Sequence, residues 1–66
     1  MFVKIGNRRI KLSSIGEYER GKSLSNGQWY LDMKVSGKNR LFFFTKEEEL
    51  DNMVAYLDKA LKVVEV

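Results

Sequence analysis

The chain has 66 residues, of which 44% are hydrophobic and 32% are charged, and its formal net charge at pH 7 is +3. A chain of this length is expected to form one domain that buries only about 60% of the surface exposed by its unfolded form. It contains no cysteine and no histidine, which excludes disulfides and structural zinc sites of the usual kind. We expect neither a secretory signal peptide nor a membrane span, because the longest unbroken apolar stretch is residues 41–44.

The charges are distributed unevenly along the chain. Residues 1–46 hold ten Lys/Arg against three acids, whereas residues 47–66 hold six acids against two lysines. The resulting balances are +7 and −4, and the division coincides with a change from strand-like to helical patterning. We therefore expect a basic β-sheet portion over residues 1–45 and an amphipathic helix over residues 46–64.

The first two predicted strands form a hairpin around Gly6-Asn7. Alternating apolar residues flank this pair, and a glycine-led two-residue loop is typical of the primed turn types. In that register Val3 faces Ile10, and Lys4 faces Arg9 on the other side. Like charges that oppose each other are destabilising. Either both side chains extend into water, or an anion binds between them.

Two further strands follow a short turn. Residues 15–20 form the third predicted strand, and Gly16 indicates a bulge or bend in it. Residues 28–36 alternate cleanly, with apolar side chains on one face and Tyr30, Asp32 and Lys34 on the other.

The fifth predicted strand, residues 40–44, does not alternate. With Gly37-Lys38 as the loop of a second hairpin, Phe42 and Phe44 join the core face and Phe43 lies outside. A three-residue loop reverses this assignment. Either register leaves at least one large aromatic side chain on the face away from the core.

The C-terminal segment has the clearest pattern in the chain. Residues 45–48, Thr-Lys-Glu-Glu, form a capping box in which the Thr45 hydroxyl accepts from a backbone amide and Glu48 reaches back. Apolar side chains then recur at helical spacing on one stripe, which consists of Leu50, Met53, Val54, Leu57, Leu61 and Val64. The expected fold is α+β: an antiparallel meander of about five strands, as a small SH3-like roll or open curved sheet, with one C-terminal helix packed on it.

The residue inventory argues against catalysis. Without His or Cys there is no Ser-His or Cys-His nucleophile system and no transition-metal site of the usual kind. The glycines are spread one per turn and form no phosphate-cradling loop ahead of a helix. We expect a non-enzymatic binding protein with no catalytic residues, no metal and no cofactor.

The outer sheet face is the candidate binding site, because it interleaves cations with aromatic rings. Cations contact phosphates, and rings stack on bases. The candidate nucleic-acid-binding residues are Lys4, Arg9, Lys11, Tyr30, Lys34 and Phe43. Tyr18 and Arg20 join this face if the third strand runs without interruption. The hypothesis is non-specific binding of DNA or RNA.

One resemblance points in the same direction. Residues 12–15, Leu-Ser-Ser-Ile, followed by Gly21-Lys22, and the layout of a hairpin, a three-stranded sheet and a C-terminal helix are similar in part to the small crenarchaeal seven-kilodalton chromatin proteins. The resemblance implies that the family's duplex-intercalating apolar pair falls near Arg20 and Leu24, and its surface tryptophan near Tyr18. Only Leu24 is apolar there, and the chain is less rich in lysine.

Protein interaction is the alternative function. The chain is short, has no disulfides and exposes an aromatic side chain on an open sheet. Association as a homodimer, or as a small accessory or inhibitor subunit, would bury this side chain and stabilise the fold. The expected partners are therefore nucleic acid or a protein with an acidic surface, with a homo-oligomer as a further possibility and no membrane. The absence of cysteine fits a cytoplasmic location.

Overall fold

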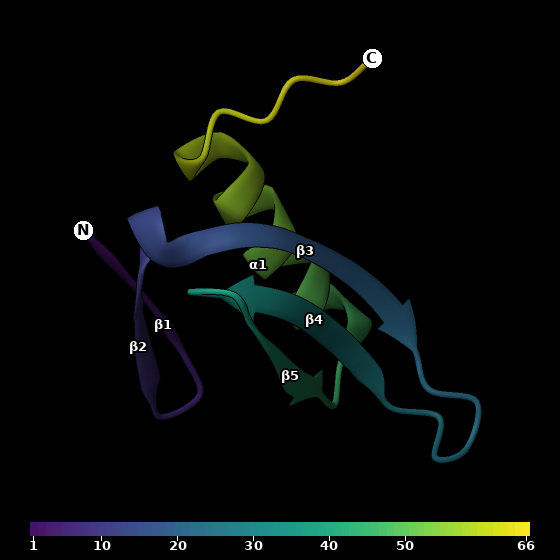
Figure 1. The fold of residues 1–66 in the computed structure, drawn as a ribbon. Coiled ribbons are helices and arrows are strands. Elements are labelled where there is room, and N and C mark those ends of the chain that lie inside the picture. Colours follow the sequence, from purple (N-terminus) through teal and green to yellow (C-terminus); the bar gives the residue numbers. More distant parts are fainter.

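The computed structural model describes residues 1–66 as five antiparallel strands in two sheets, followed by one helix. In chain order the elements are β1 (Phe2–Ile5), β2 (Arg8–Lys11), the 3-10 turn η1 (Leu12–Ser14), β3 (Ile15–Lys22), β4 (Trp29–Val35), β5 (Lys38–Phe44) and α1 (Glu47–Ala60). Strands β1 and β2 form one sheet, and the other has the order β3-β4-β5. Figure 1 shows the β1–β2 hairpin beside one end of the three-stranded sheet and α1 behind β3 and β4. The predicted α+β class, antiparallel sheet and packed C-terminal helix are confirmed.

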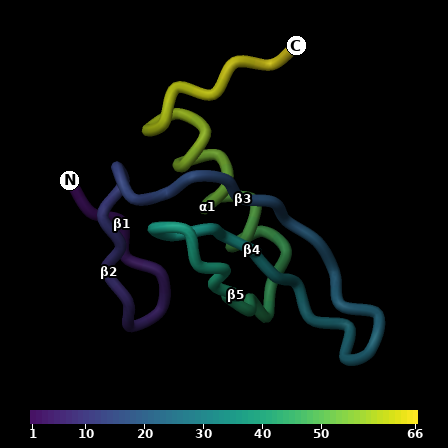
Figure 2. The backbone as a smooth tube through the Cα atoms, in the orientation of Figure 1, coloured from purple at the N-terminus to yellow at the C-terminus, as the bar shows by residue number.

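The β1–β2 hairpin has the predicted register. Val3 pairs with Ile10 and Lys4 pairs with Arg9. Gly6 has a φ of 61°, and Asn7 does not have a positive φ, which fits a II′ turn with glycine first. Figure 2 shows the hairpin at one end of the molecule and the β3–β4 loop extending from the other end.

A bulge in β3 decides which of its side chains reach the core. Ile15 pairs with Val35, but the next pair is Glu17 with Lys34, so Gly16 is the extra residue. One inserted residue exchanges the faces of all those after it. Tyr18 and Arg20 therefore lie on the core side, opposite Met33 and Leu31, and their conditional assignment to the outer face is wrong.

The β4–β5 hairpin keeps the predicted faces but has a different register. Its two-residue loop is Ser36-Gly37, with φ values of 51° and 82°, and not Gly37-Lys38. Met33 consequently pairs with Arg40, and Leu31 pairs with Phe42. A shift of two residues leaves every side chain on its own face. Phe42 therefore remains half-buried, and Phe43 is 51% exposed on the outside.

The core lies where the hairpin, β4 and α1 meet. It contains eight buried side chains and no buried polar or charged group. The hairpin and η1 supply Val3, Ile5, Ile10 and Leu12; β4 supplies Leu31 and Met33; α1 supplies Leu50 and Leu57. Each sheet packs one face against this core. The outer face of the hairpin and the outer face of the three-stranded sheet therefore lie on opposite sides of the core.

The helix is shorter than predicted at both ends. It begins at Glu47 after Lys46, and no side chain forms a capping hydrogen bond, so the predicted capping box at Thr45 is absent. Three glutamates in the first turn suit the positive end of the helix dipole instead. The helix ends at Ala60, which leaves Val64 82% exposed beyond the apolar stripe. No helix in the protein is long and apolar enough to span a membrane.

Candidate nucleic-acid interface

Arginine and lysine side chains gather where β2 lies beside the start of β5. They line an open groove, here called the cationic groove, whose residues are Arg8, Arg9, Ile10, Lys11, Ser14, Val35 and Arg40. Four of these residues are cations: Arg8, Arg9, Lys11 and Arg40. Lys4 of β1 pairs with Arg9 and is a fifth cation beside the groove. All five charged side chains are exposed.

None of these cations has a carboxylate partner. Residues 1–16 contain no Asp or Glu, and the ion pairs of the protein join Arg20 to the helix and Lys34 to Glu17. The charge of the cationic groove is therefore not neutralised by the protein itself. A surface of this kind attracts anions, and arginine forms strong charge-assisted hydrogen bonds with phosphate oxygens.

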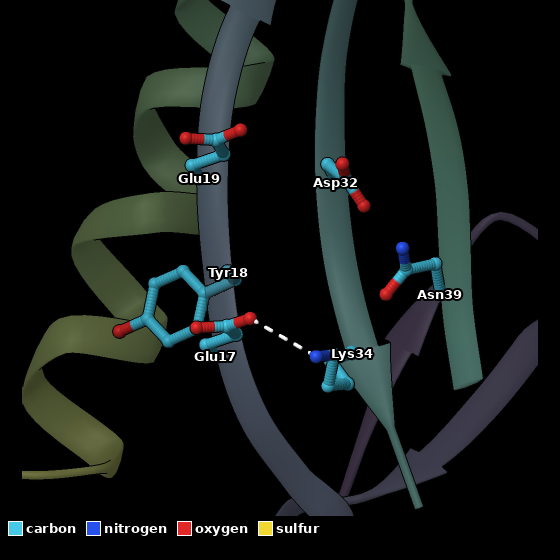
Figure 3. A pocket seen from close by; sticks show the side chains of 6 residues that line it. All are labelled: Glu17, Tyr18, Glu19, Asp32, Lys34 and Asn39. Atoms are coloured by element: carbon cyan, nitrogen blue, oxygen red, sulfur yellow. Dashed lines mark ion pairs between the residues drawn. The ribbon is translucent and has the colours of Figure 1, made fainter. Parts of the chain in front are cut away.

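The outer face of the three-stranded sheet has the opposite character near its middle. Figure 3 shows Glu17 beside Lys34, whose Nζ lies 3.3 Å from Glu17 Oε1, and Glu19 and Asp32 farther along the same two strands. Three carboxylates against one ammonium group make this part of the face acidic. Lys34 is on the outer face as predicted, but its surroundings favour a local ion pair over contact with phosphate.

The far end of the same face is a shallow aromatic groove. It has a volume of about 640 Å³ and is lined by Lys22, Ser23, Leu24, Ser25, Tyr30, Asp32, Leu41 and Phe43. Tyr30 and Phe43 are direct cross-strand partners, as expected for a ring pair on neighbouring strands. Leu24 is 102% exposed and Leu41 is 52% exposed. Apolar and aromatic surface is thus open to water here.

Gly21 sets the position of the Tyr30 ring. It pairs with Tyr30 across β3 and β4, and a Cβ added at Gly21 would overlap the Tyr30 hydroxyl and ring. The ring therefore lies across the glycine backbone, in space that any other residue would occupy. This contact directs Tyr30 over β3.

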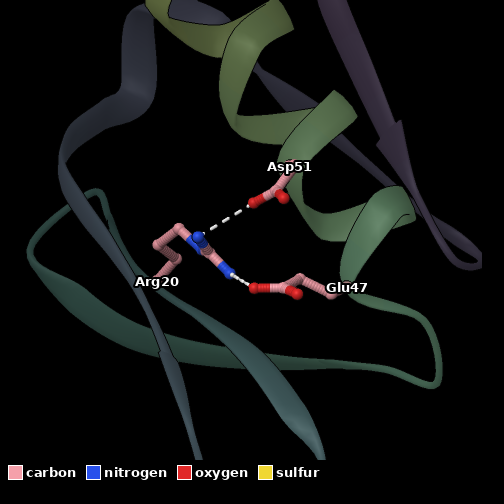
Figure 4. A network of polar contacts seen from close by, with 3 residues as sticks. All are labelled: Arg20, Glu47 and Asp51. Carbon is pink, nitrogen blue, oxygen red and sulfur yellow. Dashed lines mark hydrogen bonds and ion pairs between the residues drawn. The ribbon is translucent and has the colours of Figure 1, made fainter.

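Tyr18 and Arg20 tie β3 to α1. The Tyr18 hydroxyl donates a hydrogen bond of 2.7 Å to Asp58 Oδ1. Burial, then this hydrogen bond and the charge of Asp58, raise the pKa of Tyr18 to about 12. Arg20 contacts Glu47 at 3.0 Å and Asp51 at 2.9 Å, as Figure 4 shows.

The resemblance to the chromatin proteins implied that Tyr18, Arg20 and Leu24 lie on a duplex-binding surface. The contacts of Tyr18 and Arg20 with the helix do not fit that role. Tyr18 and Arg20 are engaged with the helix, and Leu24 lies alone on the β3–β4 loop.

The six predicted residues fall into two separate groups. Lys4, Arg9 and Lys11 lie on the hairpin, whereas Tyr30, Lys34 and Phe43 lie on the outer face of the three-stranded sheet. The shared core separates the two faces. The three hairpin cations are therefore not interleaved with the rings, and Lys34 is the one predicted cation on the face of Tyr30 and Phe43.

Sequence reasoning missed Arg8 and Arg40. Both lie at core-side positions by strand alternation, since Arg8 pairs with Ile5 and Arg40 with Met33. A long side chain near the end of a strand can extend past the core into water. A cation near the start of a strand whose remaining residues on that face are apolar is the signal that could have found them: Arg8 begins β2, and Arg40 follows Lys38 and precedes Phe42 and Phe44 on the core face of β5.

Comparison with protein-family models, with curated proteins and with solved structures finds no significant match. No group of three or more His, Cys, Asp or Glu side chains is arranged to hold a metal ion.

Proposed function

We propose that the protein binds nucleic acid without sequence specificity, by contacting phosphates through the cationic groove. One observation carries the proposal: Arg8, Arg9, Lys11 and Arg40 line one groove, exposed and without a carboxylate partner. Arg20 and Lys34, in contrast, form ion pairs with carboxylates. An unneutralised row of cations matches the regular negative charge of a phosphate backbone.

Low sequence specificity follows from the kind of contacts available. Phosphate contacts fix position and carry no sequence information. The one helix has an acidic first turn and packs its apolar stripe on the core, so it is unsuited to the major groove. Neither DNA nor RNA is favoured by phosphate contacts alone. We expect a non-enzymatic protein that acts in the cytoplasm, given its lack of cysteine.

Charge reversal in the cationic groove tests the proposal. Arg9→Glu with Lys11→Glu changes the net charge from +3 to −1, since each reversal removes two charges. The matched control, Lys59→Glu with Lys62→Glu, changes the net charge equally on the exposed side of the helix end. Fluorescence anisotropy at low salt measures binding to labelled mixed-sequence oligonucleotides, both single-stranded and duplex.

We expect the groove variant to lose most binding and the control to retain it. Circular dichroism should show both variants folded, because all four substituted side chains are exposed. An equal loss in the two variants would mean that net charge and not the groove governs binding. No binding by the wild type at tens of micromolar (about the range of weak non-specific affinity) would refute the proposal and leave an acidic protein as the partner.

A further inference from the structure

The cationic groove and the aromatic groove share the strand β5. Arg40 of β5 lines the first, and Leu41 and Phe43 of β5 line the second. Arg40 pairs with the buried Met33, whereas Phe43 pairs with Tyr30 on the outer face. The two grooves therefore open on opposite sides of β5, and Arg40 and Phe43 lie about 10 Å apart along the strand at about 3.3 Å per residue.

Nothing in the protein closes the edge between them. β5 is the last strand of the order β3-β4-β5, and its backbone forms hydrogen bonds only with β4. The N–H and C=O groups on its other edge are unpaired. A bound ligand chain that passes from one groove to the other would cross this edge, and it could accept hydrogen bonds from those backbone amides.

We infer that one single strand of nucleic acid occupies both grooves, with phosphates in the cationic groove and unpaired bases against Phe43 and Tyr30. This inference rests on the proposed function and assigns its substrate class. A single strand can turn around the edge of β5 within a few nucleotides. A duplex cannot, because its persistence length is about 150 base pairs, and its bases are not free to stack on side chains.

The charges around the aromatic groove agree with this path. The lining holds one cation and one acid, and the Lys22 ammonium group lies over the Trp29 ring, 5.1 Å from its centroid, so stacking and not phosphate attraction is expected to hold the bases there. Glu17 and Glu19 make β3 acidic and keep the sugar-phosphate chain away from that side. The backbone is therefore held on the β5 side, toward Arg40.

The test compares three labelled ligands by fluorescence anisotropy at one salt concentration. They are a mixed-sequence DNA strand of about 12 nucleotides, the same sequence as a duplex, and a strand of equal length in which every site is abasic. The abasic strand keeps the phosphates and the flexibility but removes the stacking. The variants are Phe43→Ala and Tyr30→Ala, and Tyr56→Ala is the control, an exposed ring on the helix.

We expect the wild type to bind the complete strand more tightly than the abasic strand by about 5-fold to 150-fold for each stacked base. Phe43→Ala and Tyr30→Ala should reduce this ratio and leave abasic binding unchanged, and Tyr56→Ala should change neither. Gly21→Ala should act like Tyr30→Ala, because its Cβ displaces the ring.

Two results would overturn the inference. If the complete strand, the abasic strand and the duplex bind equally, the rings do not contact bases, and the proposed function stands without this substrate class. If sedimentation shows a wild-type dimer that Phe43→Ala converts to monomer, with no dependence on bases, a second copy of the chain occupies the aromatic groove. Failure of all three ligands to bind would refute the proposed function itself.

Discussion

Tyr18 shows how one inserted residue changes the role of a side chain. Without the bulge at Gly16 it would lie on the outer face, away from the helix; with it, the phenol reaches Asp58 on the helix. Because the hydroxyl donates to a carboxylate, ionisation of the phenol would break the hydrogen bond and place two negative charges together. Burial and this partner therefore both favour the protonated phenol in the folded state.

The raised pKa predicts a loss of stability at high pH. The pKa of Tyr18 is about 12 in the folded protein against 10.0 for an unperturbed tyrosine. The folded state holds the proton more tightly, so its stabilising effect is complete below about pH 10 and is lost as the pH rises toward about 12. Denaturant unfolding across this window should show a steeper fall for the wild type than for Tyr18→Phe. Equal pH profiles would mean that Tyr18 does not account for the loss.

Arg20 is the second residue that joins β3 to the helix. Its guanidinium contacts Glu47 and Asp51 and also lies 5.5 Å from the centroid of the Trp29 ring. Ion pairs that are about half-exposed contribute about 0.2–1 kcal/mol each. Arg20→Ala should therefore lower the free energy of unfolding by about 0.5–2 kcal/mol, with cation–π contact included.

Salt dependence separates the ionic part of that effect from packing. In about 1 M salt, surface ion pairs are largely screened, so the difference between wild type and Arg20→Ala should shrink. Arg40→Ala, which removes an unpaired arginine, should change stability little at either salt concentration. A difference for Arg20→Ala that is unaffected by salt would assign its role to contact with Trp29 alone.

At the scale of elements, the helix is held by its buried stripe and not by a cap. Leu50 and Leu57 are fully buried. Leu57→Ala should cost about 2–5 kcal/mol, enough to unfold a marginal domain. Val64→Ala, which lies beyond the helix, and Thr45→Ala, which is not the cap residue, should each stay within about 0.5 kcal/mol of wild type. Urea denaturation would contradict this assignment if Thr45→Ala cost as much as a lost cap.

The sequence was sufficient for elements whose signals are local. Alternation around Gly6-Asn7 predicted the hairpin register, and the 3.6-residue period predicted the helix. The β4–β5 loop was missed because Ser36 adopts a φ of 51°, a conformation that non-glycine residues rarely take. The predicted core-side and outer faces of β5 were nevertheless right, because a register error of two residues leaves each side chain on the same face of the sheet.

The binding surface was less predictable because it depends on how two sheets meet. Strand patterns show which face of each sheet is buried, but they do not show the direction in which each outer face then points. The prediction therefore merged Lys4, Arg9 and Lys11 with Tyr30 and Phe43 on one surface. The structure places the core between them, and brings Arg40 to the hairpin cations instead.

At the scale of the whole molecule, the distribution of charged side chains should affect nucleic-acid binding more than the net charge does. The molecule extends 31 × 26 × 18 Å, and the Debye length is about 8 Å at physiological ionic strength. A phosphate in the cationic groove is therefore screened from most charges outside its immediate surroundings. The local surplus of cations, and not the net charge of +3, should set the affinity for nucleic acid.

The slope of log affinity against log salt should depend on the number of groove residues that contact phosphates. Contacts from Arg8, Arg9, Lys11 and Arg40 should give a slope of log affinity against log salt of about −3.6 on a duplex and about −2.8 on a single strand. Arg40→Gln should reduce the magnitude of the slope by about 0.7–0.9, because one phosphate contact is lost. Lys59→Gln, which removes the same charge from the helix, should leave it unchanged. Anisotropy titrations over a series of salt concentrations measure both slopes, and equal changes in the two variants would show that binding responds to net charge and not to the groove.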